Sequence, residues 1–320
     1  MIGVIPMREY FLINENGISE ADKEKANLEI YRMPSERDKN KFIDSYKLPK
    51  DIFHFDDMPE IAPRIETLEN NILGELSIFV ISNINEHLEN LSVEDRLESH
   101  TFLLTKNKLF WFMHKDSLDP YQYLFNPDAK NIDSLESFIV HTGLLTYKNF
   151  TIELNNQKNR IDDLHRSAMY STSNAVLISV ADTERDMVML QHTIDTQEIA
   201  FKKLLENQTF LANLNNDALI YDIKWYNRQV NQLVLVYRDL LDATSSLFTD
   251  IMSNNLNQLM KFLSSLSLIL ASSTFIASLW GMNTGGLPFK KYPYGSLIML
   301  FISLFAGFMM YLYLKRKDRL

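Results

Sequence analysis

The chain has 320 residues, no cysteine and a formal net charge of −9 at pH 7. The absence of cysteine excludes disulfide frameworks and thiolate metal sites, and the acidic balance argues against a nucleic-acid partner. The charge is unevenly placed, because residues 1–280 carry 26 basic and 40 acidic side chains, a net charge of −14. We therefore expect a large acidic aqueous part that attracts cations.

The N-terminal third is rich in turn-forming residues and in apolar runs. Seven of the nine prolines precede Asp128, and the segments Leu76–Ile84 and Thr101–Met113 are dominated by aromatic and aliphatic residues. The second segment has a polar Lys-Asn-Lys step at 106–108 between two apolar arms, which predicts a hairpin. Residues 1–145 are therefore predicted to form an α/β domain. No nucleophile elbow, phosphate loop or histidine-glutamate zinc motif occurs, so the sequence does not indicate an enzyme.

Long helices are predicted for the middle of the chain. Residues 128–287 contain no proline, and residues 144–280 contain no glycine. Turns normally need these residues, so their absence indicates long helices with short connections. One amphipathic helix is predicted over 174–207, and a second begins near 217 and meets no helix breaker before Gly281, which makes it nearly 100 Å long. Residues 146–260 are predicted to form a long-helix bundle and stalk.

Two uncharged apolar runs follow, 262–280 with 19 residues and 294–314 with 21. As helices they reach about 28 to 32 Å, close to the thickness of the hydrocarbon layer of a bilayer. Residues 261–320 are therefore predicted to form a transmembrane hairpin in contact with the lipid bilayer.

The orientation of this hairpin follows from its flanks. The start MIGVIPMREYF lacks the features of a signal peptide, which favours a cytoplasmic N-terminal part. The basic tail KRKDRL fits a cytoplasmic C-terminus, whereas Lys290 and Lys291 in the link argue the other way. Two spans place both termini on one side, so we expect a cytoplasmic (inner) membrane protein with both ends in the cytoplasm.

Mostly small or polar residues recur at alternating steps of three and four along the first span and the residues just before it, and so form a stripe on one side of the helix. Before Gly281 its members are Asn257, Met260, Ser264, Ser267, Ala271, Thr274 and Ser278. In lipid such a stripe faces protein or water. It indicates either close helix packing or, in a ring of subunits, a water path. Continued toward the N-terminus, the same alternation of three and four residues includes Asp250 and Asp239. In a ring of subunits these residues would form rings of carboxylates; otherwise they belong to an ordinary solvated helix face.

Gly281, Met282 and Asn283 end the first span just before a short loop and the last span. With SNNLNQLMKFL at 253–263 and TFIA at 274–277, this arrangement resembles the CorA superfamily of divalent-cation transporters. The resemblance implies a funnel-shaped homopentamer of an α+β cytoplasmic domain, a long stalk helix and a two-helix transmembrane hairpin, with the first span lining the pore.

The resemblance also implies roles for single residues. Asn283 would form a ring at the outer mouth that accepts hydrogen bonds from the water of a hydrated Mg²⁺, Co²⁺, Ni²⁺ or Zn²⁺ ion. A basic collar at the inner surface would consist of Lys261, Lys315, Arg316 and Lys317. No resident cofactor is implied, only a transported or regulatory divalent cation.

Two alternatives remain open. The loop Thr284-Gly285-Gly286-Leu287-Pro288 contains no acidic residue and resembles the zinc-transporting ZntB branch, which favours a proton-coupled zinc transporter. Neither span contains histidine, aspartate or glutamate as a proton carrier, which favours passive flow. The other alternative is a membrane-tethered interaction protein without transport.

His54, Asp56 and Asp57 form a local cluster of nitrogen and oxygen ligands upstream. Such a cluster could bind a divalent metal, or it is a charged surface loop.

Overall fold

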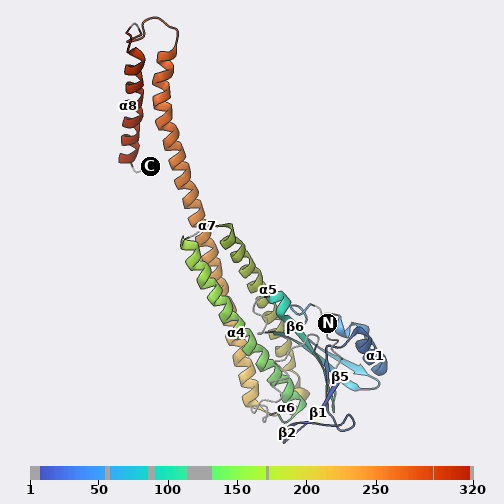
Figure 1. Cartoon of the computed structure of the whole chain (residues 1–320). Helices are drawn as coiled ribbons and strands as arrows, with labels where there is room; N and C mark the ends of the chain where they lie inside the picture. The colour runs from blue at the N-terminus through green and yellow to red at the C-terminus, as the bar shows by residue number, and fades with distance from the viewer. Residues whose placement is uncertain are drawn as a thin grey trace. The chain divides into compact units, whose positions relative to one another are not determined.

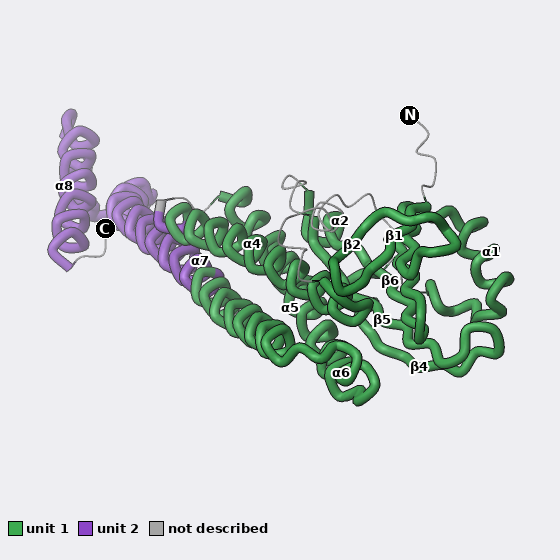
Figure 2. The backbone as a smooth tube through the Cα atoms, turned by 90° about the horizontal axis from the view of Figure 1, so that it is seen from below, with its two compact units in different colours: residues 1–167, 173–244 green, residues 168–172, 245–320 purple. Residues whose placement is uncertain are grey.

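The computed structural model describes residues 8–54, 58–85, 91–113, 132–170, 173–290 and 292–317 (Figure 1). The backbone divides into two compact units, one of residues 1–167 and 173–244 and the other of residues 168–172 and 245–320 (Figure 2). We call them unit 1 and unit 2. The domain boundaries expected at 145 and 260 stay predictions.

In the part of unit 1 that the structure describes, seven strands form one sheet in the order β2-β1-β3-β7-β6-β5-β4. Its strands β3 and β7 pair in parallel, and the other neighbours are antiparallel. The strands are β1 (Arg8–Asn14), β2 (Gly17–Glu20), β3 (Leu28–Arg32), β4 (Arg64–Asn70), β5 (Gly74–Ile84), β6 (Leu97–Leu104) and β7 (Leu109–Met113).

Both apolar segments of the N-terminal third form strands. The segment 76–84 lies within β5, and the predicted hairpin is confirmed as β6 and β7, where Leu104 pairs with Leu109 across the turn. The Thr105 hydroxyl closes this turn by donating to the Lys108 carbonyl at 2.9 Å. All five residues of β7 and the first seven of β6 are buried. Such strands need a covering layer on each face of the sheet.

Helices supply both layers. On one face, α1 (Glu36–Tyr46) and η1 (Lys50–Phe53) pack through Phe42, Ile43 and Ile52 against the strands. Helix α1 begins at a capping box in which Ser35 and Asp38 bond each other's backbone amides. The short helix α2 (Val93–Arg96) directly precedes β6. On the other face lie α4 (Leu135–Tyr170), α5 (Asn174–Leu204), α6 (Gln208–Leu214) and the first part of α7.

The close approach of α4 and α5 depends on one glycine. A Cβ atom at Gly143 of α4 would lie 2.2 Å from Cζ of Phe201 on α5, and Phe201 is 1% exposed. The aromatic ring therefore fills the space that any other residue would need at position 143.

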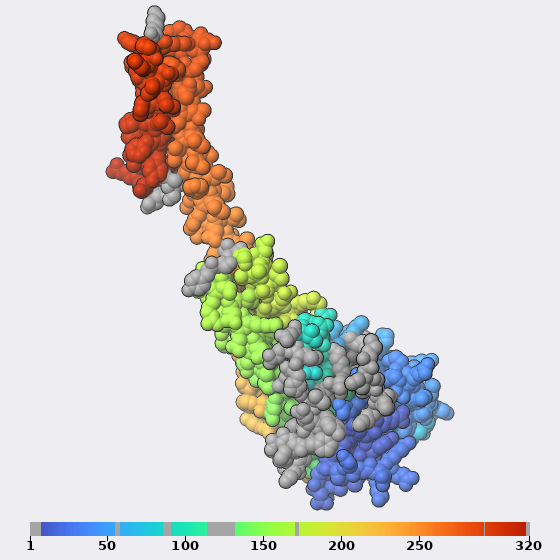
Figure 3. Space-filling view, viewed as in Figure 1, coloured from blue at the N-terminus to red at the C-terminus, as the bar shows by residue number. Residues whose placement is uncertain are grey.

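Helix α7 (Asp217–Gly281) runs for 65 residues without interruption, which confirms the predicted long helix. Its last part and α8 (Gly295–Arg316) are each long and apolar enough to cross a membrane. The side chains of these segments are almost all exposed, unlike those of a core helix in a soluble protein. In unit 2 the two helices lie side by side (Figure 3). The predicted order of an α+β domain, a long helix and an apolar hairpin is confirmed.

Candidate functional site

Small residues hold the hairpin of unit 2 together. The Ser303 hydroxyl of α8 donates to the main-chain oxygen of Ser273 on α7 at 2.7 Å. A Cβ atom at Gly307 would lie 2.3 Å from Ser273 Oγ and 3.6 Å from the Ile269 carbonyl oxygen. Ser265, on the same side of α7, is also buried. The helices thus approach closely because glycine and serine line the contact, as is common between membrane helices.

The predicted pore-lining stripe lies on another side of α7. At about 100° per residue, its centre is roughly 170° around the helix axis from Ile269 and Ser273. Every member is exposed, namely Asn257, Met260, Ser264, Ser267, Ala271, Thr274 and Ser278. Packing between α7 and α8 therefore does not account for the stripe, and the face remains accessible to other molecules.

The predicted acidic positions extend this exposed face along α7. Asp239 and Asp250 are both exposed. They lie roughly opposite the residues through which α7 is buried, which are Val230, Val234, Tyr237, Leu241, Thr244 and Phe248. The two carboxylates are 11 positions apart, or about 16 Å along a helix.

The triplet Gly281-Met282-Asn283 stands where α7 ends. Asn283 is exposed, and the Met282 amide donates to the Leu279 carbonyl at 3.4 Å in the last turn. Two side chains tie the following loop back to this end of the helix. The Trp280 indole donates to the Pro288 carbonyl at 2.9 Å, and the Lys290 ammonium group donates to the Met282 carbonyl at 2.8 Å.

The predicted basic residues lie on both helices of unit 2. Lys261 on α7 and Lys315, Arg316 and Lys317 at the end of α8 are all exposed. The Lys315 ammonium lies 5.9 Å from the ring centre of Tyr311, and that of Lys317 lies 5.1 Å from the ring centre of Tyr313. Amphipathic tyrosine rings next to lysines are typical of helix ends at a membrane surface.

Of the predicted upstream metal ligands, only His54 lies within the described residues. His54 is an exposed residue at the end of η1, whereas Asp56 and Asp57 lie outside the described residues. Within the described ranges, no group of three histidine, aspartate or glutamate side chains is arranged to hold a metal ion. The metal site thus stays a prediction.

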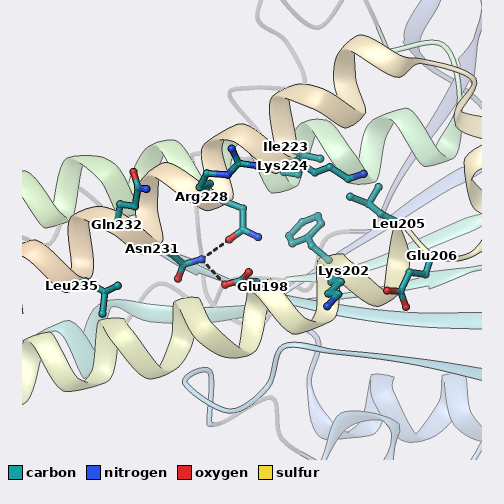
Figure 4. Close-up of a pocket in the computed structure, with 12 residues that line it drawn as sticks. Glu198, Lys202, Leu205, Glu206, Ile223, Lys224, Arg228, Asn231, Gln232 and Leu235 are labelled. Carbon is teal, nitrogen blue, oxygen red and sulfur yellow. Dashed lines mark hydrogen bonds between the residues drawn. The ribbon is translucent and has the colours of Figure 1, made fainter.

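A cavity of about 480 Å³ opens between α5 and α7 in unit 1 (Figure 4). Its polar groups bond one another, because the Asn231 amide donates to the carboxylate of Glu198 and to the side-chain oxygen of Asn227, each at 2.7 Å. None of the predicted site residues lines this cavity.

Sequence reasoning missed the residues that shape the hairpin. Ser303 and Gly307 lie on a helix that is apolar all round, so no periodicity singled them out. Lys290 entered the sequence analysis only as a positive charge in the loop that bears on membrane orientation. Nothing in the sequence indicates that its side chain folds back onto the Met282 carbonyl.

Known proteins with a similar sequence identify the family of this chain. The model of the family described as CorA-like Mg²⁺ transporter protein matches residues 31–316. The chain is 22% identical over 259 residues to the cobalt/magnesium transport protein CorA of Thermotoga maritima, covering 80% of this chain and 72% of that protein.

Two solved structures share the fold. The CorA magnesium transporter of Methanocaldococcus jannaschii aligns with a TM-score of 0.74 at 14% identity, covering 99% of both chains. The ZntB cytoplasmic domain of Vibrio parahaemolyticus aligns with a TM-score of 0.58 at 14% identity, covering 78% of this chain and 99% of that domain. The family match over nearly the whole chain and the shared fold confirm the resemblance read from the triplet and the hairpin. The chain belongs to the CorA-like Mg²⁺ transporter family, whose members move divalent cations across membranes, and carries two membrane spans.

Proposed function

We propose that this chain forms a homopentamer in the cytoplasmic membrane, with both ends in the cytoplasm, and that α7 lines a pore for a hydrated divalent cation. The observation that supports this most directly is the exposed polar stripe, which lies opposite α8. One hairpin cannot enclose a pore, so several copies must bring their stripes together. The family resemblance supplies the number five.

In this assembly Asn283 forms the outer ring and contacts the ion through its bound water. Mg²⁺ loses water reluctantly, so amide oxygens that bond its hydration shell suit it better than direct ligands. Asn257 and Thr274 supply further polar rings along α7. Met260 and Leu263 are 66% and 63% exposed, and as rings they form an apolar constriction that closes by excluding water.

The remaining charged residues act near the cytoplasmic end of the pore. Asp239 and Asp250 form carboxylate rings that raise the local concentration of cations. Lys261, Lys315, Arg316 and Lys317 form a basic collar at the inner membrane surface. His54 with Asp56 and Asp57 remains a candidate regulatory metal site.

Magnesium and cobalt are the first candidate ions, because the family description names Mg²⁺ and the Thermotoga relative is named for cobalt and magnesium. Nickel is included because the resemblance to the CorA superfamily implies it. A membrane potential of −100 mV favours inward movement of a divalent cation by roughly 4.6 kcal/mol, so passive uptake needs no other energy source. Proton-coupled zinc transport is the second candidate. It is supported by the Thr284–Pro288 loop and by the shared fold with the ZntB domain.

The deciding experiment measures ion flux into proteoliposomes that contain the purified full-length protein. Mg²⁺, Co²⁺, Ni²⁺ and Zn²⁺ are compared at a fixed membrane potential, with and without a pH gradient. Voltage-driven Mg²⁺ or Co²⁺ uptake that does not respond to pH is the expected result. Zinc uptake that rises with the pH gradient would instead establish the second candidate.

A membrane-tethered interaction protein would give a different outcome. It predicts no flux of any of the four ions, and it does not require a ring of subunits. Light scattering of the purified protein in detergent measures the oligomer mass independently of flux. A monomer without flux would overturn the proposed function.

A further inference from the structure

Lys290 binds the end of the proposed pore helix. Its ammonium group donates to the Met282 carbonyl at 2.8 Å, directly beyond the last residue of α7. The final carbonyls of a helix lack partners within the helix and form the negative end of its dipole. A lysine that reaches back to them is therefore stabilised by charge as well as by the hydrogen bond.

The loop backbone holds Lys290 in this position. The preceding residue, Phe289, has a left-handed backbone with φ of +63°. A Cβ atom at Gly295 would lie 2.1 Å from the Phe289 carbonyl oxygen, so the start of α8 presses directly on this turn. The Trp280 indole bonds the Pro288 carbonyl two residues before Lys290. The loop backbone thus places Lys290 within reach of the end of α7.

This arrangement puts a positive charge next to Asn283, the neighbour of Met282 in the chain. From Gly281 to Tyr294 the sequence has two lysines and no acidic residue that would neutralise them. An ammonium group at the Met282 carbonyl also occupies a position that a cation could otherwise take. A cation arriving at this loop therefore meets both a repelling charge and an oxygen that is already bonded.

We propose that Lys290 positions the Gly281-Met282-Asn283 triplet and, as a tethered cation at the outer mouth, sets how strongly divalent ions bind there. In the proposed ring, each subunit contributes one such ammonium group. The residue then keeps occupancy of the outer site low, so that ions pass without being held. This inference rests on the proposed function.

The test measures Mg²⁺ uptake into proteoliposomes over a range of concentrations, at low salt and at about 0.15 M salt, where the Debye length is about 8 Å. Lys290→Gln and Lys290→Met remove the charge in two different ways, so the test survives if one of them fails to assemble. Lys290→Arg keeps the charge and a donor. Lys291→Gln removes the same charge one position along the chain and is the matched control.

We expect both neutral variants to lower the half-saturating Mg²⁺ concentration by at least about fivefold at low salt, because one unit charge about 8 Å from a divalent ion in water already has roughly this effect and every subunit of the proposed ring loses one charge. The difference should shrink at the higher salt concentration. Lys290→Arg should behave like the wild type, and Lys291→Gln should have a smaller effect than Lys290→Gln.

Three results would overturn the inference while leaving the proposed function intact. These are an unchanged half-saturating concentration in both neutral variants, an equal change in Lys291→Gln, or a change that does not depend on salt. Absence of flux in the wild type would instead overturn the proposed function and, with it, this inference.

Discussion

The Ser303 hydroxyl bonds the main-chain oxygen of Ser273, and this contact fixes which side of α7 faces α8. Four serine residues of α7 illustrate the two sides of this helix. Ser273 and Ser265 lie on the side that packs within the hairpin, whereas Ser264 and Ser267 lie on the exposed stripe. The same side chain thus contributes to helix packing on one side of α7 and to the exposed stripe on the other. Substitutions on each side can test the two roles separately.

A matched pair of alanines tests the pore-lining stripe. Ala271 is on the stripe, and Ala277 is exposed on the same helix about 120° away from it. We expect Ala271→Leu to reduce Mg²⁺ flux to background, because five leucines would crowd the pore with apolar side chains. Ala277→Leu should retain flux. Proteoliposome uptake measures both variants, and equal behaviour of the two would contradict the assignment of the stripe.

The outer ring is tested by Asn283→Ala. Losing an acceptor that bonds the hydration shell of the ion should lower Mg²⁺ flux by at least about tenfold, the equivalent of one hydrogen bond per ion. Asn255→Ala is the control, because Asn255 is an exposed α7 residue roughly opposite the stripe. Light scattering should show the same oligomer for both variants. Undiminished flux in an intact Asn283→Ala oligomer would remove Asn283 from the pathway.

The long-range pattern of the sequence predicted most of the fold. The absence of glycine and proline predicted α7, and its two ends agree with the observed helix. The apolar arms on both sides of the polar step at 106–108 predicted the β6–β7 hairpin. The parallel pairing of β3 with β7 was not predictable, because it joins strands far apart in the chain that have no shared pattern. The Lys290 contact was not predictable either, since it depends on the left-handed backbone at Phe289.

Gly143 should be intolerant of even one added methyl group. A Cβ atom there overlaps the buried ring of Phe201, so Gly143→Ala should destabilise unit 1 by about 1–3 kcal/mol. Thermal unfolding of the full chain in detergent measures the change. Adding Phe201→Leu should recover part of the loss in the double variant, relative to Phe201→Leu alone. A Gly143→Ala protein as stable as the wild type would show that the ring moves freely.

His141 on α4 makes the stability of the fold sensitive to acid. Burial lowers its pKa below the ordinary value of 6.5, and Lys148 adds to this effect, while Asp133 and Asp222 oppose it. The unfolded chain therefore binds a proton more readily than the folded chain, so the free energy of unfolding falls as pH drops below 6.5 toward the folded pKa.

The measurement compares apparent unfolding temperatures of the wild type and His141→Gln across this pH window, at one scan rate. The wild type should lose more stability on acidification than the variant, which cannot take up the proton. Parallel pH profiles for the two proteins would rule out a contribution from His141.

The two edge strands of the sheet, β2 and β4, are poorly suited to pairing with the sheet of another molecule. Strand β2 has only four residues, and β4 presents the exposed carboxylates Glu66 and Glu69. Short or charged edge strands resist pairing with the edges of other sheets, which is the usual route to aggregation. In the proposed homopentamer, the copies of unit 1 would therefore remain separate folded bodies instead of joining into one extended sheet.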